Sequence, residues 1–173
     1  MKDYVKLKIR NIVDFPKKGI IFRDITTACK DPKALKMIID YLTEQFKDKG
    51  IDYVAAVESR GFVFGSALAC NINAGLILIR KPGKLPADVV SQEYELEYGT
   101  DKIEMHKDAI EAGKKVLLVD DLLATGGTML AACELVKKVG AIPAACAFVI
   151  ELEALKGREK FDNNIEVVSM LKY

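Results

Sequence analysis

The stretch VLLVDDLLATGGT, which starts at Val116 and ends at Thr128, decides the fold of this 173-residue chain. A short apolar run leads directly into Asp120 and Asp121, and a loop with two glycines follows. Such a run is typical of a strand buried on both faces of a parallel sheet. Ligands of open α/β sheets bind outside the carboxyl ends of the strands. We therefore expect the acids and the loop to form a ligand site at that edge.

The loop has the residues of an anion site. Gly126 and Gly127 let the main chain approach a ligand closely and adopt positive φ. The N–H groups of Ala124 and its neighbours, with those of the first turn of the following helix, can surround a phosphate, and the helix dipole favours its charge. Thr125 and Thr128 add hydroxyl donors. We expect a phosphate group to bind here.

The two carboxylates need a different partner, because they would repel a phosphate beside them. Asp120 and Asp121 must face either a cation or a neutral part of the ligand. A ribose diol presents two donors to a carboxylate that accepts both, so the stretch predicts a cradle for ribose 5-phosphate. The sequence has neither a GxxxxGK[ST] nor a GxGxxG motif, which argues against a P-loop and a dinucleotide fold. The simpler alternative is a tight turn after a solvated strand end.

The rest of the chain alternates apolar strands with helices, which predicts a single domain, 1–173, with a parallel sheet flanked by helices. Asp31 followed by Pro32 predicts a helix start, and Gly50 its end. The other elements that we expect are strands at 53–57, 75–79, 115–121 and 144–150, helices at 4–13, 61–72 and 128–140, and a solvent-facing antiparallel hairpin at 89–105.

The overall composition limits the classes of binding partner that this chain can have. Half of the residues are hydrophobic and the net charge is +1, so there is no strong positive field to attract nucleic acid or a membrane surface. We find neither a secretory signal nor an apolar run of the ~20 residues that span a bilayer. The four cysteines are widely spaced and suggest reduced thiols rather than zinc ligands. We expect a cytoplasmic protein.

The opening stretch resembles the phosphoribosyl-diphosphate motif of the type I phosphoribosyltransferases, and its DDLLATGGT form is closest to members that act on adenine. Five other segments resemble that family in the same order along the chain: DFPKKGIIFRDIT, ESRGF, RKPGKLP, LEYG and ELEALKGREKF. The resemblance implies transfer of phosphoribose from phosphoribosyl diphosphate to adenine, giving AMP and diphosphate, with Mg²⁺ as cofactor. It also implies a homodimer, a hairpin lid, and a small hood built from about 1–30 and 151–173.

The resemblance places ESRGF and RKPGKLP at the diphosphate. Ser59 and the N–H of Gly61 can extend an anion nest, and the planar fork of Arg60 suits a diphosphate. We assign Arg60 a catalytic role, since it can draw charge onto the leaving group. Lys81 and Lys84 are the expected ligands on the second loop. A solvated surface loop is the alternative for both segments.

The expected lid carries the candidate for proton transfer. Glu97 matches the position proposed in the family to exchange a proton with the base, and Tyr98 would pack nearby. A closed lid would exclude water, which would otherwise attack an oxocarbenium-like transition state. The alternative is that Glu93, Glu95 and Glu97 form the wet face of the hairpin.

The base is expected to bind at the start of the chain. The resemblance supports Ile21 and Arg23 at adenine, and the main-chain N–H and C=O of Ile21 could read its edge. A 6-oxo purine would then leave a carbonyl unpaired, a mismatch that can cost ~10⁴ in discrimination. Phe22 could wall the flat ring, with Leu155 on the opposite side.

Several alternatives stay open from the sequence. The same scaffold could serve hypoxanthine, xanthine or orotate, or a non-catalytic regulator that senses phosphoribosyl diphosphate. A receiver domain would need an acceptor aspartate at another strand end, where the sequence offers none. Asp120 or Asp121 could bind Mg²⁺ directly, but we expect both to contact ribose, with the metal held mainly by substrate and water. His106, the only histidine, is expected to begin a short helix and to take no part in the chemistry.

Overall fold

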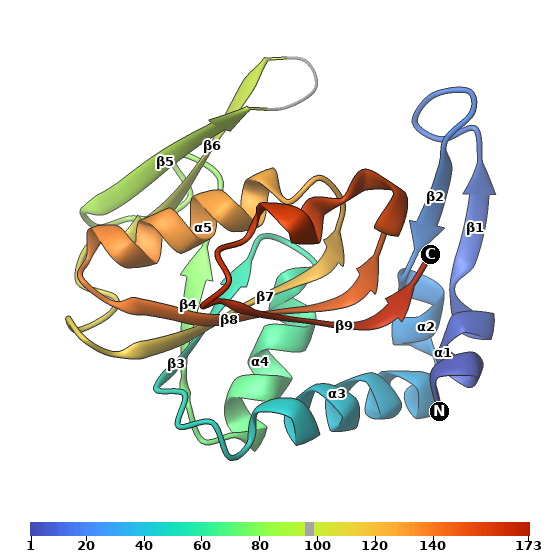
Figure 1. Ribbon diagram of the computed structural model, residues 1–173, viewed down its shortest axis with the longest axis horizontal. Coiled ribbons are helices and arrows are strands. Elements are labelled where there is room, and N and C mark those ends of the chain that lie inside the picture. Colours follow the sequence, from blue (N-terminus) through green and yellow to red (C-terminus); the bar gives the residue numbers. More distant parts are fainter. Residues whose placement is uncertain (96–98) are drawn as a thin grey trace.

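A computed structural model describes residues 1–95 and 99–173, and its centre is a five-stranded parallel sheet (Figure 1). The strand order is β4-β3-β7-β8-β9. The strands are β3 (Tyr53–Val57), β4 (Gly75–Ile79), β7 (Lys115–Leu123), β8 (Ile142–Glu151) and β9 (Glu166–Lys172). The α/β fold that the alternating pattern predicts is confirmed.

Helices cover both faces of this sheet, and β7 shows why its sequence is continuously apolar. Leu117 and Val119 pack in one core with α3 (Pro32–Phe46) and α4 (Gly61–Asn71). Val116 and Leu118 pack in a second core with α5 (Gly127–Lys138). Successive side chains of a strand point to opposite faces, so a strand covered on both sides needs apolar residues at every position.

The N-terminal segment differs from the expected helix at 4–13. It forms α1 (Lys2–Lys8), then β1 (Arg10–Val13) and β2 (Ile21–Asp24), an antiparallel pair, before α2 (Thr26–Lys30). Ile12 faces Phe22 and Val13 faces Ile21 across this pair. The β-branched residues at 12 and 13 favour a strand once a partner is present, and the tertiary pairing outweighs the helical spacing of the apolar residues.

The expected hairpin is present as β5 (Val89–Glu95) and β6 (Thr100–His106), which form an antiparallel sheet of their own. It stands beside α5 at one side of the main sheet (Figure 1). His106 ends β6 and does not begin a helix, which corrects the sequence expectation. The predicted proton-transfer residue Glu97 and the lid residue Tyr98 lie outside the described residues.

The C-terminal segment contains elements that the sequence pattern did not reveal. Two short 3₁₀ helices, η1 (Glu153–Leu155) and η2 (Gly157–Lys160), follow β8 and lead into β9. The chain end reaches the N-terminal pair of strands (Figure 1), where the guanidinium of Arg23 lies 4.3 Å from the ring centre of Tyr173. The two ends of the chain are therefore in contact, as a hood built from both would require, although its boundaries stay a prediction.

Candidate active site

A cleft at the carboxyl ends of β3, β4 and β7 brings together six of the predicted site residues, namely Ser59, Arg60, Lys81, Asp120, Asp121 and Thr128. Its volume is about 240 Å³, and the hairpin contributes one wall. The residues that line it are Val57, Glu58, Ser59, Arg60, Ile79, Lys81, Tyr94, Ile103, Asp120, Asp121 and Thr128. The sequence put the acids at the end of a strand, whereas β7 continues two residues beyond them to Leu123. Both acids line the cleft from within this strand.

The predicted phosphate loop, residues 124–128, lines a second hollow of about 200 Å³ that shares Arg60, Asp120, Asp121 and Thr128 with the first. Gly126 has φ of 85° and directly precedes α5. This left-handed conformation favours glycine. It turns the chain so that the N-terminal end of α5 faces the hollow, where N–H groups are free of helical partners and suit an anion.

The acid pair is held in two different ways. Asp121 is buried, and its carboxylate accepts a hydrogen bond from Nε of Arg60. The half-buried Asp120 accepts from the main-chain N–H of Asp121 at 2.8 Å. Burial, with the negative charge of Asp121 beside it, raises the pKa of Asp120 well above its usual value. Hydrogen bonds from the hydroxyl groups of a ligand would stabilise the ionised form of such a buried carboxyl group.

Arg60 lies at the junction of the diphosphate loop and the acids. It immediately precedes α4, and its side chain is about half exposed to the cleft. Burial opposes its charge, but the hydrogen bond and charge of Asp121 outweigh that effect and raise the pKa of the guanidinium. The next residue, Gly61, packs so closely on β7 that a Cβ there would lie 2.7 Å from the carbonyl oxygen of Val119. The first residue of α4 therefore lies in close contact with β7 beside Asp120.

The second basic loop is organised by acids that the sequence analysis did not select. Glu58 accepts from the main-chain N–H of Lys81 at 2.9 Å and from Nε of Arg80 at 3.1 Å. The ammonium of Lys81 contacts Asp101 and the hydroxyl of Tyr94, both on the hairpin. Burial lowers the pKa of Lys81, but these two contacts raise it by more.

Lys81 therefore faces the cleft with its charge held by the hairpin. Lys84 differs, since in the described part of the chain it lines neither hollow, and its carbonyl accepts from Arg80 at 3.3 Å. Asp101 and Tyr94 were missed because only the register of β5 and β6, which pairs them, brings Tyr94 to the cleft and Asp101 to Lys81. Glu58 lay within ESRGF, and its position after a strand was the available signal.

The expected adenine residues gather on the hood, outside the two hollows as lined by the described residues. Ile21 is exposed at the start of β2. Phe22 meets Phe15 edge-on, with ring centres 5.3 Å apart. Arg23 stacks on Tyr173 and donates to Oδ1 of Asn11 at 2.5 Å. Leu155, on η1, is exposed.

The fold and the site together define a class of protein. The paired acids and the glycine loop at 124–128 lie at the carboxyl end of β7, and the cationic loops follow β3, which is next to β7, and β4, which is next to β3. The phosphoribosyl transferase domain family matches residues 26–172, and the chain belongs to this family. None of the helices in the described ranges is long and apolar enough to cross a membrane.

The particular branch follows from its relatives. An adenine phosphoribosyltransferase of Halothermothrix orenii is 55% identical over 91% of this chain and 93% of its own length. The crystal structure of the enzyme of that name from Thermoanaerobacter pseudethanolicus is 48% identical, covers both chains fully and superposes with a TM-score of 0.96. The Saccharomyces cerevisiae enzyme, complexed with an imino-altritol bisphosphate and adenine, is 40% identical over 98% of both chains, with a TM-score of 0.91. The chain is an adenine phosphoribosyltransferase.

Proposed function

We propose that this chain transfers the 5-phosphoribosyl group from phosphoribosyl diphosphate to adenine, giving AMP and diphosphate in purine salvage. The observation that carries the proposal is that two hollows share Arg60, the acid pair and Thr128, with Lys81 lining one hollow and the phosphate loop lining the other. One end of the donor is a phosphate, the middle is a diol and the other end is a diphosphate. The cleft offers matching groups in that order.

The phosphate loop anchors the 5-phosphate through the N–H groups of residues 124–128 and the hydroxyls of Thr125 and Thr128. Asp120 and Asp121 accept the ribose hydroxyls and fix the ring. For this, Arg60 must leave Asp121 at least in part, and the diphosphate supplies its new partner. The substrate therefore replaces the Arg60–Asp121 ion pair by two contacts, one between Arg60 and the diphosphate and one between Asp121 and the ribose hydroxyls. Neither charge is then left without a partner.

The leaving diphosphate is bound by the first turn of α4 and the basic loop, through Ser59, Arg60, Gly61, Lys81 and Lys84. These groups draw negative charge toward the diphosphate as the bond to ribose C1 breaks and N9 of adenine attacks. Positioning of the two reactants and stabilisation of charge provide most of the acceleration. Mg²⁺, when bound, would neutralise part of the diphosphate charge and orient it. The carboxylate oxygens of Asp120 and Asp121 fit such a hard cation, with substrate and water as its main ligands.

Adenine is proposed to bind between the hood and the cleft, against Ile21, Phe22, Arg23 and Leu155. The stacking of Arg23 on Tyr173 supports a defined wall there. Glu97 is proposed to exchange the proton at the base, which requires hydrogen-bond reach of a purine nitrogen. The test is purified protein with phosphoribosyl diphosphate, Mg²⁺ and each of adenine, hypoxanthine and xanthine. Formation of AMP from adenine, with no product from hypoxanthine or xanthine, supports the proposal. Formation of IMP from hypoxanthine without AMP from adenine refutes it.

A homodimer is proposed from the edge strand β4. Leu76 and Leu78 point to one side of this strand and are 41% and 38% exposed. They line a hollow with Leu85 and His106, and a second copy would cover this apolar surface. Sedimentation at a series of concentrations tests it, since a monomer that persists at the highest concentration would refute the dimer. The cytoplasmic location also stays a proposal, tested by fractionation of cells.

A further inference from the structure

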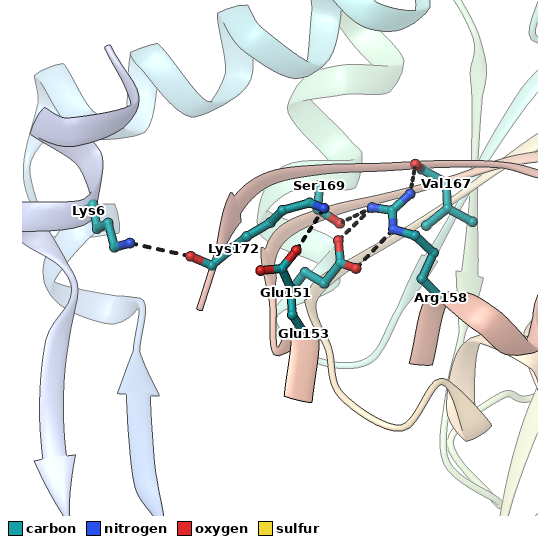
Figure 2. Close-up of polar contacts among 7 residues, drawn as sticks. All are labelled: Lys6, Glu151, Glu153, Arg158, Val167, Ser169 and Lys172. Carbon is teal, nitrogen blue, oxygen red and sulfur yellow. Dashed lines mark hydrogen bonds and ion pairs between the residues drawn. The ribbon is translucent and has the colours of Figure 1, made fainter. Parts of the chain in front are cut away.

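Figure 2 shows a bidentate ion pair between Glu151 and Arg158, and neither residue lines the two hollows of the candidate site as the described residues define them. Glu151 ends β8 and is buried. Arg158, on η2, donates from Nε to Oε1 of Glu151 at 2.9 Å and from Nη2 to Oε2 at 2.5 Å. Nη2 also reaches Oγ of Ser169 at 3.2 Å, and Nη1 donates to the carbonyl of Val167. All three guanidinium nitrogens are therefore used, which fixes the direction of the fork as well as its charge.

The residue before this arginine touches the phosphate loop with main chain alone. Gly157 is buried, and a Cβ on it would lie 2.2 Å from the carbonyl oxygen of Ala124 and 3.1 Å from the N of Gly126. In return, a Cβ on Gly126 would lie 3.0 Å from the carbonyl oxygen of Gly157. Two glycines thus face each other, so the path of η2 determines where the loop can lie.

We propose that Arg158 is a positioning residue for the phosphate loop: its fork on Glu151 holds Gly157 against Ala124 and Gly126, and so keeps the loop N–H groups directed at the 5-phosphate. This inference rests on the proposed function. The register of the sheet supports it, because Leu123, the residue before the loop, pairs with Glu151. The fork therefore acts on the loop from the strand beside it and from the turn behind it. The hydrogen bonds from Arg158 also lower the pKa of Glu151, which keeps the carboxylate charged.

Two variants test this link from opposite sides. Gly157→Ala keeps the fork but adds a methyl group where the loop carbonyl lies, and Arg158→Met removes the fork but keeps the glycine. Both should raise the Kd for ribose 5-phosphate, measured by calorimetry, and the KM for phosphoribosyl diphosphate by about tenfold or more. The KM for adenine should stay within about twofold, because the loop is proposed to bind the phosphate and not the base. A smaller folded fraction would instead lower kcat and leave both KM values unchanged. Arg158→Lys, which keeps the charge without the fork, should fall between.

The matched control is Lys172→Met. The ammonium of Lys172, on β9, binds Glu153 of η1 at 2.9 Å (Figure 2) but has no part in the contact at Gly157. Its Kd for ribose 5-phosphate should stay within about twofold of the unchanged protein. Thermal unfolding of every variant shows which are folded at the assay temperature. If Arg158→Met is not folded, Gly157→Ala and Arg158→Lys decide.

Ribose 5-phosphate binding unchanged within about twofold in the folded Gly157→Ala and Arg158 variants would overturn the inference, as would a fall in kcat with both KM values unchanged. The proposed function fails separately. If the protein without substitutions binds ribose 5-phosphate but makes no AMP from adenine, the proposed reaction is refuted. The comparison of Kd values among the variants still decides the role of Arg158. Unchanged protein that does not bind ribose 5-phosphate overturns both.

Discussion

Replacing Gly61 by alanine should separate the diphosphate loop from the ribose acids. A Cβ at this position would lie 2.7 Å from the carbonyl oxygen of Val119 and 3.2 Å from Oδ1 of Asp120. Ordinary van der Waals contact begins near 3.4 Å, so α4 and β7 must move apart by 3.4 − 2.7 = 0.7 Å. Overpacking of this kind costs about 1–3 kcal/mol, and each kcal/mol lowers Tm by roughly 2–4 °C in a domain of this size.

The same shift should reduce activity beyond the loss of stability. A misplacement of 1 Å in an active site can cost about 100-fold, so we expect kcat/KM of Gly61→Ala to fall roughly ten- to hundredfold, or about 1.4–2.7 kcal/mol. The assay is the initial rate of AMP formation well below Tm, with both substrates varied.

Gly65→Ala on the same helix is the matched control. Its Cβ would meet Cβ of Ala56 at 2.6 Å, in the core beneath α4 and away from the cleft lining. It should lose a similar amount of stability, while kcat/KM stays within about threefold. Equal activity of the two variants would refute the argument that the close approach of Gly61 positions Asp120.

Three further outcomes are expected. Asp120→Asn should lower kcat/KM by about 100-fold or more yet raise the Tm of the ligand-free protein. Because the native pKa of Asp120 is raised, its ionisation makes stability fall as pH increases from the unfolded pKa through the native one. The gain in Tm of Asp120→Asn over the unsubstituted protein should therefore be larger at pH 8 than at pH 4. An equal gain at both pH values would contradict this expectation. Lys81→Met should raise the KM for phosphoribosyl diphosphate about tenfold with the KM for adenine unchanged, so an equal rise in both would argue against a diphosphate ligand. EDTA should abolish AMP formation reversibly without lowering the Tm of the ligand-free protein, because Mg²⁺ is held mainly by substrate; a lower Tm would indicate a metal bound by the protein itself.

Local sequence order was enough to predict the central part of this fold. The apolar run at 116–119 predicted a strand covered on both faces, which β7 confirms. The helix start at Asp31 is confirmed by its side chain, which accepts from the N–H of Ala34 at 2.9 Å. The apolar run, the acid pair and the glycines follow one another within the 13 residues from Val116 to Thr128, so their chemistry could be inferred without knowing any long-range contact.

The C-terminal strand and the hairpin contacts could not be inferred in this way. Residues 166–172 join the edge of the sheet by pairing with the free side of β8. Ser169 interrupts the apolar pattern of this strand, and its hydroxyl accepts a hydrogen bond from Arg158. Asp101 reaches Lys81 through the register of two strands, which depends on pairings distant in sequence.

The sequence by itself determined the α/β class and predicted the phosphate loop and the acid pair, because these depend on neighbours a few residues apart. Only the tertiary structure decided that Arg60 pairs with Asp121, that Lys81 is held by the hairpin, and that Gly157 lies against the loop. The physical reason is that hydrophobic periodicity and turn chemistry are local, whereas a charge or a glycine acquires its role from the particular atoms that folding brings within contact.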